Sequence, residues 1–110
     1  MQLPSSLPVT DEFHTPVFGT VFAGRADVVR RLTPGDALIL VPDPPGIDDP
    51  NVWVHARGGD VVGHLRPDIG APLSTWMLAG GRCAAWVWRV GTDSDASWRR
   101  LVITVRRHSV

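Results

Sequence analysis

The stretch that decides the fold is Val52-Trp53-Val54-His55-Ala56-Arg57-Gly58-Gly59-Asp60-Val61-Val62-Gly63-His64-Leu65. Alternate residues over 52–57 are apolar, so one face of this segment suits a core, while the other carries Trp53, His55 and Arg57. The Gly-Gly-Asp sequence that follows is typical of a tight turn. The stretch therefore predicts a β-hairpin with strands over 52–57 and 61–65.

Four further strands and two helices are predicted on either side of the hairpin. The β-rich runs that end at glycine, proline or polar turns are 17–22, 37–41, 82–90 and 97–107. Apolar spacing predicts helices over 25–32 and 67–79, and we expect the regular part of the second to begin near Gly70 or Ala71, because Pro72 lies inside it. The order is β-α-β-β-β-α-β-β, and its short strands and tight turns favour a closed or half-closed barrel over an open sheet.

The length of 110 residues suits one domain with one core. Residues 1–12 contain Pro4 and Pro8 and show no period, so we expect a flexible tail before a domain over 13–107.

The chain has neither a basic and apolar leader nor an apolar run of membrane-spanning length, which predicts a cytoplasmic protein without membrane contact. The only cysteine, Cys83, lies in an apolar run and is expected to be a buried thiol.

Charge is balanced over the whole chain but unevenly distributed along it. The formal net charge is zero, yet residues 1–60 carry a net charge of −4 and residues 61–110 a net charge of +4. Such an asymmetry marks either a polar binding surface or a solvated face. All the basic residues except histidine are arginine, which suits bidentate contacts to phosphate better than lysine does.

The sequence does not carry the patterns that catalysis requires. Serine, histidine and aspartate occur without a nucleophile-elbow pattern, and there is no glycine loop for phosphate. The four histidines lack metal-ligand spacing, and one cysteine cannot make a cluster. We therefore expect a binding protein rather than an enzyme, with no catalytic residues, no cofactor and no metal.

Several short motifs occur in an order that is more specific than any one of them. They are Gly19-x-x-Phe22-x-Gly24-Arg25, Gly35-Asp36-x-Leu38-x-Leu40, Asp43-Pro44, Asp49-Pro50-Asn51-Val52-x-Val54 and Gly59-x-x-Val62-Gly63-His64-Leu65. In this order, over residues 16–106, the chain resembles the HIRAN domain. That family occurs at the N-terminus of some helicases and as small stand-alone bacterial proteins. The resemblance implies an OB-like six-stranded β-barrel with two short helices that captures single-stranded DNA at a free 3′ end.

The resemblance carries over to some binding positions and not to others. An aromatic pair of the DNA-binding members falls here on Val21 and Phe22, so one stacking ring is missing. A motif tyrosine falls on Asp48, which replaces a ring by an anion, while the motif aspartate and asparagine are kept as Asp49 and Asn51.

The motif histidine is His64, and the basic residue after it is Arg66, but the next basic position is Pro67. Trp53 can also stack on a base. The candidate nucleic-acid-binding residues are thus Phe22, Asp49, Asn51, Trp53, His64 and Arg66.

Three of these positions also have a purely structural interpretation. Asp49 and Asn51 can fix a turn through side-chain to backbone hydrogen bonds, and His64 can be a satisfied polar edge of the hairpin. Among the remaining tryptophans, we expect core packing for Trp76, Trp86 and Trp88. Trp98 lies beside two arginines and is either an alternative stacking platform or a packed surface residue.

Two functions follow from these patterns. The first is binding of single-stranded DNA or DNA 3′ ends, in DNA repair or processing, with a helicase or nuclease as partner. DNA and RNA are not distinguished by the residues themselves. The alternative is a protein-interaction or scaffold domain that keeps the HIRAN fold but has lost the DNA-end pocket, because Asp43, Asp48 and Asp49 would repel phosphate.

Overall fold

A single sheet of six antiparallel strands and two helices form the described part of the chain. The computed structural model describes residues 12–22, 24–43, 51–92 and 94–108. Its elements, in chain order, are β1 (Glu12–Pro16), α1 (Arg25–Arg30), β2 (Ala37–Pro42), β3 (Val52–Ala56), β4 (Val61–His64), α2 (Pro67–Leu78), β5 (Arg82–Val90), the 3₁₀ turn η1 (Ser97–Arg99) and β6 (Leu101–His108). The prediction of a mostly β chain with six strands and two helices is confirmed.

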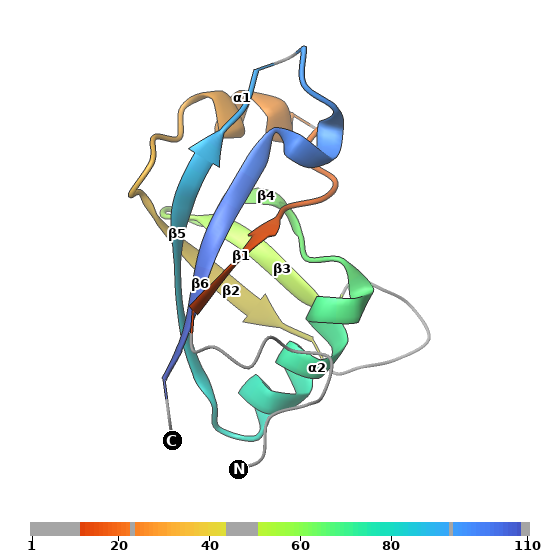
Figure 1. Ribbon diagram of the computed structural model, residues 1–110, viewed down its shortest axis with the longest axis vertical. Coiled ribbons are helices and arrows are strands. Elements are labelled where there is room, and N and C mark those ends of the chain that lie inside the picture. The colour runs from red at the N-terminus through yellow and green to blue at the C-terminus, as the bar shows by residue number, and fades with distance from the viewer. Residues whose placement is uncertain (1–11, 23, 44–50, 93, 109–110) are drawn as a thin grey trace.

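The sheet curls into a half-barrel whose two edges meet at one point. The strand order is β1-β6-β5-β2-β3-β4, so β1 and β4 are the edges. Beyond β1, Phe18 forms an isolated antiparallel bridge with His64 of β4, and each backbone N–H donates to the other's carbonyl at 2.9 Å. Figure 1 shows α1 near one end of the curled sheet and α2 near the other.

The core lies inside the curl, where the alternating side chains of the strands point. Val52 and Val54 of β3 are fully buried, as the hairpin pattern predicts, and the apolar stripe of α2 packs Leu73 and Trp76 against them. The β3–β4 turn contains Gly58 and Gly59, both with positive φ, which is the backbone conformation that favours glycine. The predicted hairpin is therefore confirmed.

The first strand was predicted over 17–22, and this is wrong. β1 spans Glu12–Pro16, and the next residues turn away from it after the bridge at Phe18. Gly19 has φ 73°, so the chain bends there, and Val21 and Phe22 lie exposed without a strand partner. The β propensity of this run does not decide its structure because propensity reflects packing on a pleated surface, which is absent beyond Phe18.

Two other boundaries differ from the prediction. The segment 97–100 was expected to belong to the last strand, but it forms η1, and β6 begins at Leu101. The second helix begins at Pro67 and continues through Pro72, rather than near residue 70. A proline at the first helical position costs nothing, and burial of the apolar face outweighs the one hydrogen bond that Pro72 cannot donate.

The tryptophans of β5 do not lie where the sequence suggested. Trp76 is buried as expected, but Ala85 and Val87 are the residues of β5 that face the core. Trp86 is half-buried on the opposite face, and Trp88 is 49% exposed. The strand register shifts between Val87 and Arg89, so Trp88 is the extra residue of a β-bulge. Core packing was therefore a wrong expectation for these two rings, because small residues occupy the inner face.

Candidate nucleic-acid interface

Trp53 and His64, two of the sequence-predicted residues, lie side by side on the outside of the half-barrel. They are directly paired in the register of β3 and β4. Their ring centroids are 5.8 Å apart with the planes at 80°, an edge-to-face contact. Both are half-buried, so each ring keeps an accessible part. The alternation of β3 puts Trp53 outward because Val52 and Val54 are needed inside.

Phe18 joins these rings because the barrel edges meet beside it. Its ring lies 6.4 Å from the His64 ring with the planes at 25°. The approach depends on Gly63, where a Cβ atom would come within 2.3 Å of the Phe18 carbonyl oxygen and 2.6 Å of Val17 Cγ1. The Val62-Gly63-His64-Leu65 motif thus has a physical role: two buried residues flank a glycine that permits closure and a histidine that faces outward.

Arg25 completes the group from the start of α1. Its Nη1 donates a hydrogen bond to the Gly19 carbonyl at 3.0 Å, and its guanidinium carbon lies 5.4 Å from the centre of the Trp53 ring. Gly19 leaves room for this arrangement, since a Cβ there would lie 3.0 Å from His64 Nε2 and 3.2 Å from Arg25 Nη1. We call Phe18, Arg25, Trp53 and His64 the ring cluster.

The His64 imidazole contacts the backbone of the next residue. Nδ1 lies 3.2 Å from the carbonyl oxygen of Leu65. A carbonyl oxygen only accepts, so Nδ1 donates in this contact, and the Nε2 edge faces Gly19. That edge lies on the same side as the Arg25 guanidinium. The cluster therefore places a cation and a polar nitrogen beside two aromatic rings.

The other sequence-predicted residues lie around or beneath the ring cluster. Phe22 is 63% exposed, in the turn between β1 and α1, and its carbonyl accepts from the Arg25 N–H at 2.8 Å. Arg66 is exposed at the start of α2 and forms an ion pair with Asp68, with Nε to Oδ1 at 2.8 Å. Asp49, together with Asp48, lies outside the described residues.

Asn51 has a different environment from the exposed candidates. Its side chain is 2% exposed, and its backbone carbonyl accepts from the Asp43 N–H at 2.6 Å. A base or phosphate cannot contact a side chain that has almost no accessible surface. Of the two interpretations that the sequence left open, the burial favours the bracing of the loop.

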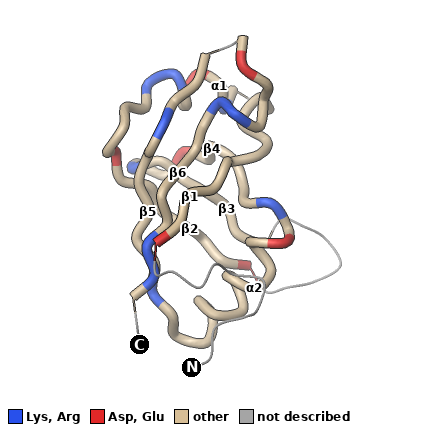
Figure 2. Tube along the Cα trace, viewed as in Figure 1, with Lys and Arg blue, Asp and Glu red and all other residues tan. Residues whose placement is uncertain are grey.

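The acidic residues beside the cluster have partners of their own. Asp43 Oδ2 accepts a hydrogen bond from Trp53 Nε1 at 3.1 Å, and the Asp43 carbonyl accepts from the Ser74 hydroxyl. Asp68 pairs with Arg66. Asp43 therefore orients the indole, and its charge also lies close to any phosphate that Trp53 would approach. Figure 2 shows basic and acidic residues interspersed over the molecule, so the charge asymmetry of the sequence does not produce two separate faces.

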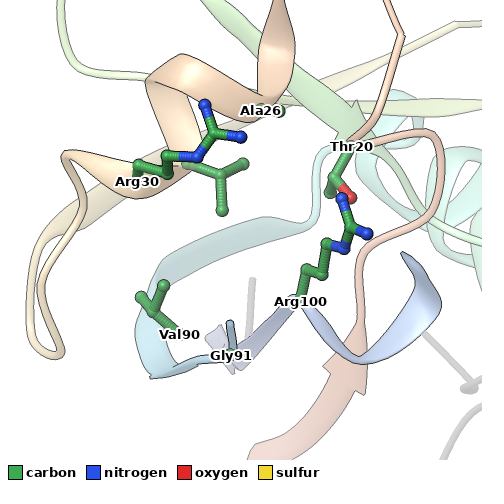
Figure 3. A pocket seen from close by; sticks show the side chains of 7 residues that line it. Thr20, Ala26, Arg30, Val90, Gly91 and Arg100 are labelled. Atoms are coloured by element: carbon green, nitrogen blue, oxygen red, sulfur yellow. The ribbon is translucent and has the colours of Figure 1, made fainter. Parts of the chain in front are cut away.

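Open concavities adjoin the cluster on the side of α1. One of about 300 Å³ is lined by Gly24, Arg25, Val28, Asp60 and Val61, a volume that can hold a small ligand group. By contrast, the space between α1 and the ends of β5 and β6, with Thr20, Val90 and Arg100 in its wall, measures about 20 Å³ (Figure 3). That space accommodates about one water molecule and no larger ligand.

Sequence reasoning did not assign Arg25 and Phe18 to the site. Arg25 stands in the quoted Gly24-Arg25 motif, so the motif was a signal, but a helix-starting arginine has many roles. Phe18 contacts His64 only because the two edges meet, and this contact spans 46 positions of the chain.

Comparison with family models, with curated proteins and with solved structures gives no match for this chain. Within the described ranges, no group of three or more His, Cys, Asp or Glu side chains is placed to hold a metal ion. The described helices also include none that is long and apolar enough to cross a membrane.

Proposed function

We propose that this protein is a nucleic-acid-binding module that takes single-stranded DNA, or a DNA 3′ end, at the ring cluster. The observation that carries the proposal is the Arg25 guanidinium over the half-buried Trp53 ring, which His64 contacts edge to face beside the place where Phe18 closes the curled sheet. Aromatic faces stack on unpaired bases, and an arginine beside them meets the phosphate.

The fold supports the same proposal at a coarser level. A curled antiparallel sheet whose edges meet is compatible with the OB-like barrel of a HIRAN-type domain, and such barrels bind single strands across their outer strand faces. By the same resemblance, the natural setting would be DNA repair or processing, with a helicase or nuclease that produces or consumes the strand.

Fluorescence anisotropy with labelled oligothymidine tests the proposal. We expect binding at low salt, where phosphate contacts are strongest, and a preference for a free 3′ hydroxyl over a 3′ phosphate. Trp53→Ala should weaken binding by about 1–3 kcal/mol, the usual value of one stacked base. Trp98→Ala is the matched control, because Trp98 also lies under an arginine, with the Arg99 guanidinium carbon 4.5 Å from its ring centre, but is not part of the ring cluster. Absence of binding at low salt would overturn the proposal.

A protein ligand is the second candidate, and one observation favours it. Ile39 and Val41 on the outer face of β2 are exposed, and Asp43 follows two residues after Val41. An apolar strip beside an acidic residue suits a protein surface better than a phosphate backbone. Pull-down from a nuclease-treated lysate, compared between the wild type and Ile39→Asp, tests this function. This function requires that the wild type retains a specific partner protein and that Ile39→Asp does not retain it.

A further inference from the structure

A second pair of stacked rings lies on the outer face of the sheet, away from the ring cluster. His14 of β1 and Trp88 of β5 have ring centroids 4.3 Å apart with the planes at 22°. Both side chains are exposed. Trp88 points outward because Ala85 and Val87 take the inner face of β5. The edge strand β1, on the far side of β6, supplies the histidine that stacks on it. An exposed, pre-stacked ring pair has no role in the core.

The two ring groups are linked by one face of β1. Residues Phe13, Thr15 and Val17 are buried, so His14, Pro16 and Phe18 all point outward. Alternate residues of a strand are about 6.8 Å apart, which is about twice the 3.4 Å rise of a stacked nucleic-acid strand. We call Trp53, His64, Phe18, Pro16, His14 and Trp88 the ring row. Its middle part, along Phe18, Pro16 and His14, thus offers platforms at a spacing that suits bases pulled apart from one another.

We propose that a single strand bound at the ring cluster continues over Phe18 and Pro16 to the His14–Trp88 pair. The proposal rests on the proposed function and deepens it by specifying the ligand as an extended single strand of about four to six nucleotides, within the range of a small barrel. A dinucleotide end would occupy the ring cluster alone, and only a longer strand would reach Trp88.

The charges along the row fit a polyanion at both of its ends. Arg25 lies over Trp53 at one end, and the exposed Arg89 directly follows Trp88 at the other. On the same face of β1, Glu12 is the acidic residue, and it stands opposite Arg106 in the β1–β6 register. Hydrogen bonds from Thr92 lower the pKa of Asp95, and the positive charge of Arg89 acts in the same direction. Flat ring faces between two cations suit bases and phosphates better than an acidic peptide.

Oligonucleotide length separates this inference from the proposed function. Anisotropy is measured with a labelled thymidine dinucleotide and a labelled thymidine decanucleotide on the wild type, Trp53→Ala, Trp88→Ala and Trp98→Ala. We expect Trp88→Ala to weaken decanucleotide binding about 5- to 150-fold, the equivalent of one lost stack, without changing dinucleotide binding. Trp53→Ala should weaken both. Trp98→Ala, which removes a ring of similar exposure outside the row, should change neither.

The possible failures are distinguishable. If Trp53→Ala weakens both ligands and Trp88→Ala weakens neither, the ring cluster binds but the extended path is wrong. If Trp98→Ala reduces decanucleotide binding as much as Trp88→Ala, the effect is not specific to the row, and the inference falls. If the wild type binds neither ligand, the proposed function itself is wrong. His14→Ala is a second variant that should reproduce the Trp88→Ala pattern, and melting curves of all variants confirm that they remain folded.

Discussion

At the scale of single residues, small side chains decide whether the site can exist. Gly63 admits the Phe18 carbonyl at a distance no other residue would allow, and Gly19 leaves room for His64 and Arg25. In both cases the glycine matters for close approach rather than for its own contacts. The side chains of the ring cluster can be replaced without preventing the edges of the sheet from meeting, whereas these two glycines cannot be replaced.

Gly63→Ala tests this argument. The added Cβ would lie 2.3 Å from the Phe18 carbonyl oxygen, and such overpacking typically costs about 1–3 kcal/mol. For a domain of this size we expect the melting temperature to fall by about 4–8 °C for each kcal/mol. Oligonucleotide binding should be lost as well, because the bridge at Phe18 opens.

Gly70→Ala is the matched control for that variant. A Cβ at Gly70 would meet no atom outside the helix closer than 3.6 Å, and alanine is the better residue inside a helix by about 1 kcal/mol. Thermal denaturation should therefore give an unchanged or higher melting temperature. Equal destabilisation by both substitutions would contradict the closure argument.

The thiol of Cys83 gives a second test at this scale. Burial raises its pKa to about 11, although Arg107 nearby acts in the opposite direction. Below this pH the folded thiol stays protonated, and only the thiolate reacts. We expect alkylation of the native protein to be slow at pH 8 and to accelerate toward pH 11, whereas the chain unfolded in urea reacts readily at pH 8. Equal rates for the two states would show that the thiol is accessible.

At the scale of elements, tertiary packing overrides local preference in both directions. The run over 17–22 has β propensity but lacks a partner beyond Phe18, so it turns. The helix α2 contains a proline that should break it, yet Leu73 and Trp76 bury enough apolar surface to keep it continuous. In β5, Ala85 and Val87 take the inner face, and this places Trp88 on the surface instead of in the expected core position.

Pro72→Ala follows from this account of α2. The alanine N–H can donate to the Asp68 carbonyl, four residues earlier, and the interior of a helix favours alanine over proline by about 3 kcal/mol. Greater freedom of the unfolded chain offsets this gain by about 0.4–1 kcal/mol. Urea denaturation should show a net stabilisation of about 2–2.6 kcal/mol with an unchanged m value. A loss of stability would mean that the proline ring is needed in the packing.

At the scale of the whole molecule, the antiparallel sheet brings distant segments to one outer surface. Phe18, Arg25, Trp53 and His64 come from four separate segments: the turn after β1, α1, β3 and β4. They meet because the strand order places β4 at one edge and β1 at the other, and because the sheet curls until these edges touch (Figure 1). Opposite charges are interspersed, so the net charge does not predict binding.

Salt dependence tests binding at this scale. If Arg66 contacts phosphate, Arg66→Ala should lower the affinity for every sequence, and the slope of log K against log salt should flatten by about 0.7, the value for one contact with a single strand. Arg82→Ala, at the exposed start of β5, should leave the slope unchanged. An unchanged slope for Arg66→Ala would mean that this arginine serves only its ion pair with Asp68.

The sequence by itself determined the mostly β class, the hairpin at 52–65 and the inward face of β3, because alternation and glycine-rich turns act between neighbouring residues. The same alternation made Trp53 a candidate, and the Val62-Gly63-His64-Leu65 motif made His64 one.

Only the tertiary structure decided the position of β1, the exposure of Trp88, the burial of Asn51 and the addition of Phe18 and Arg25 to the ring cluster. Each of these depends on which distant segment lies alongside. The curl of the sheet, and with it the contact between Phe18 and His64, arises from the packing of all six strands around one core, which no local pattern in the sequence encodes.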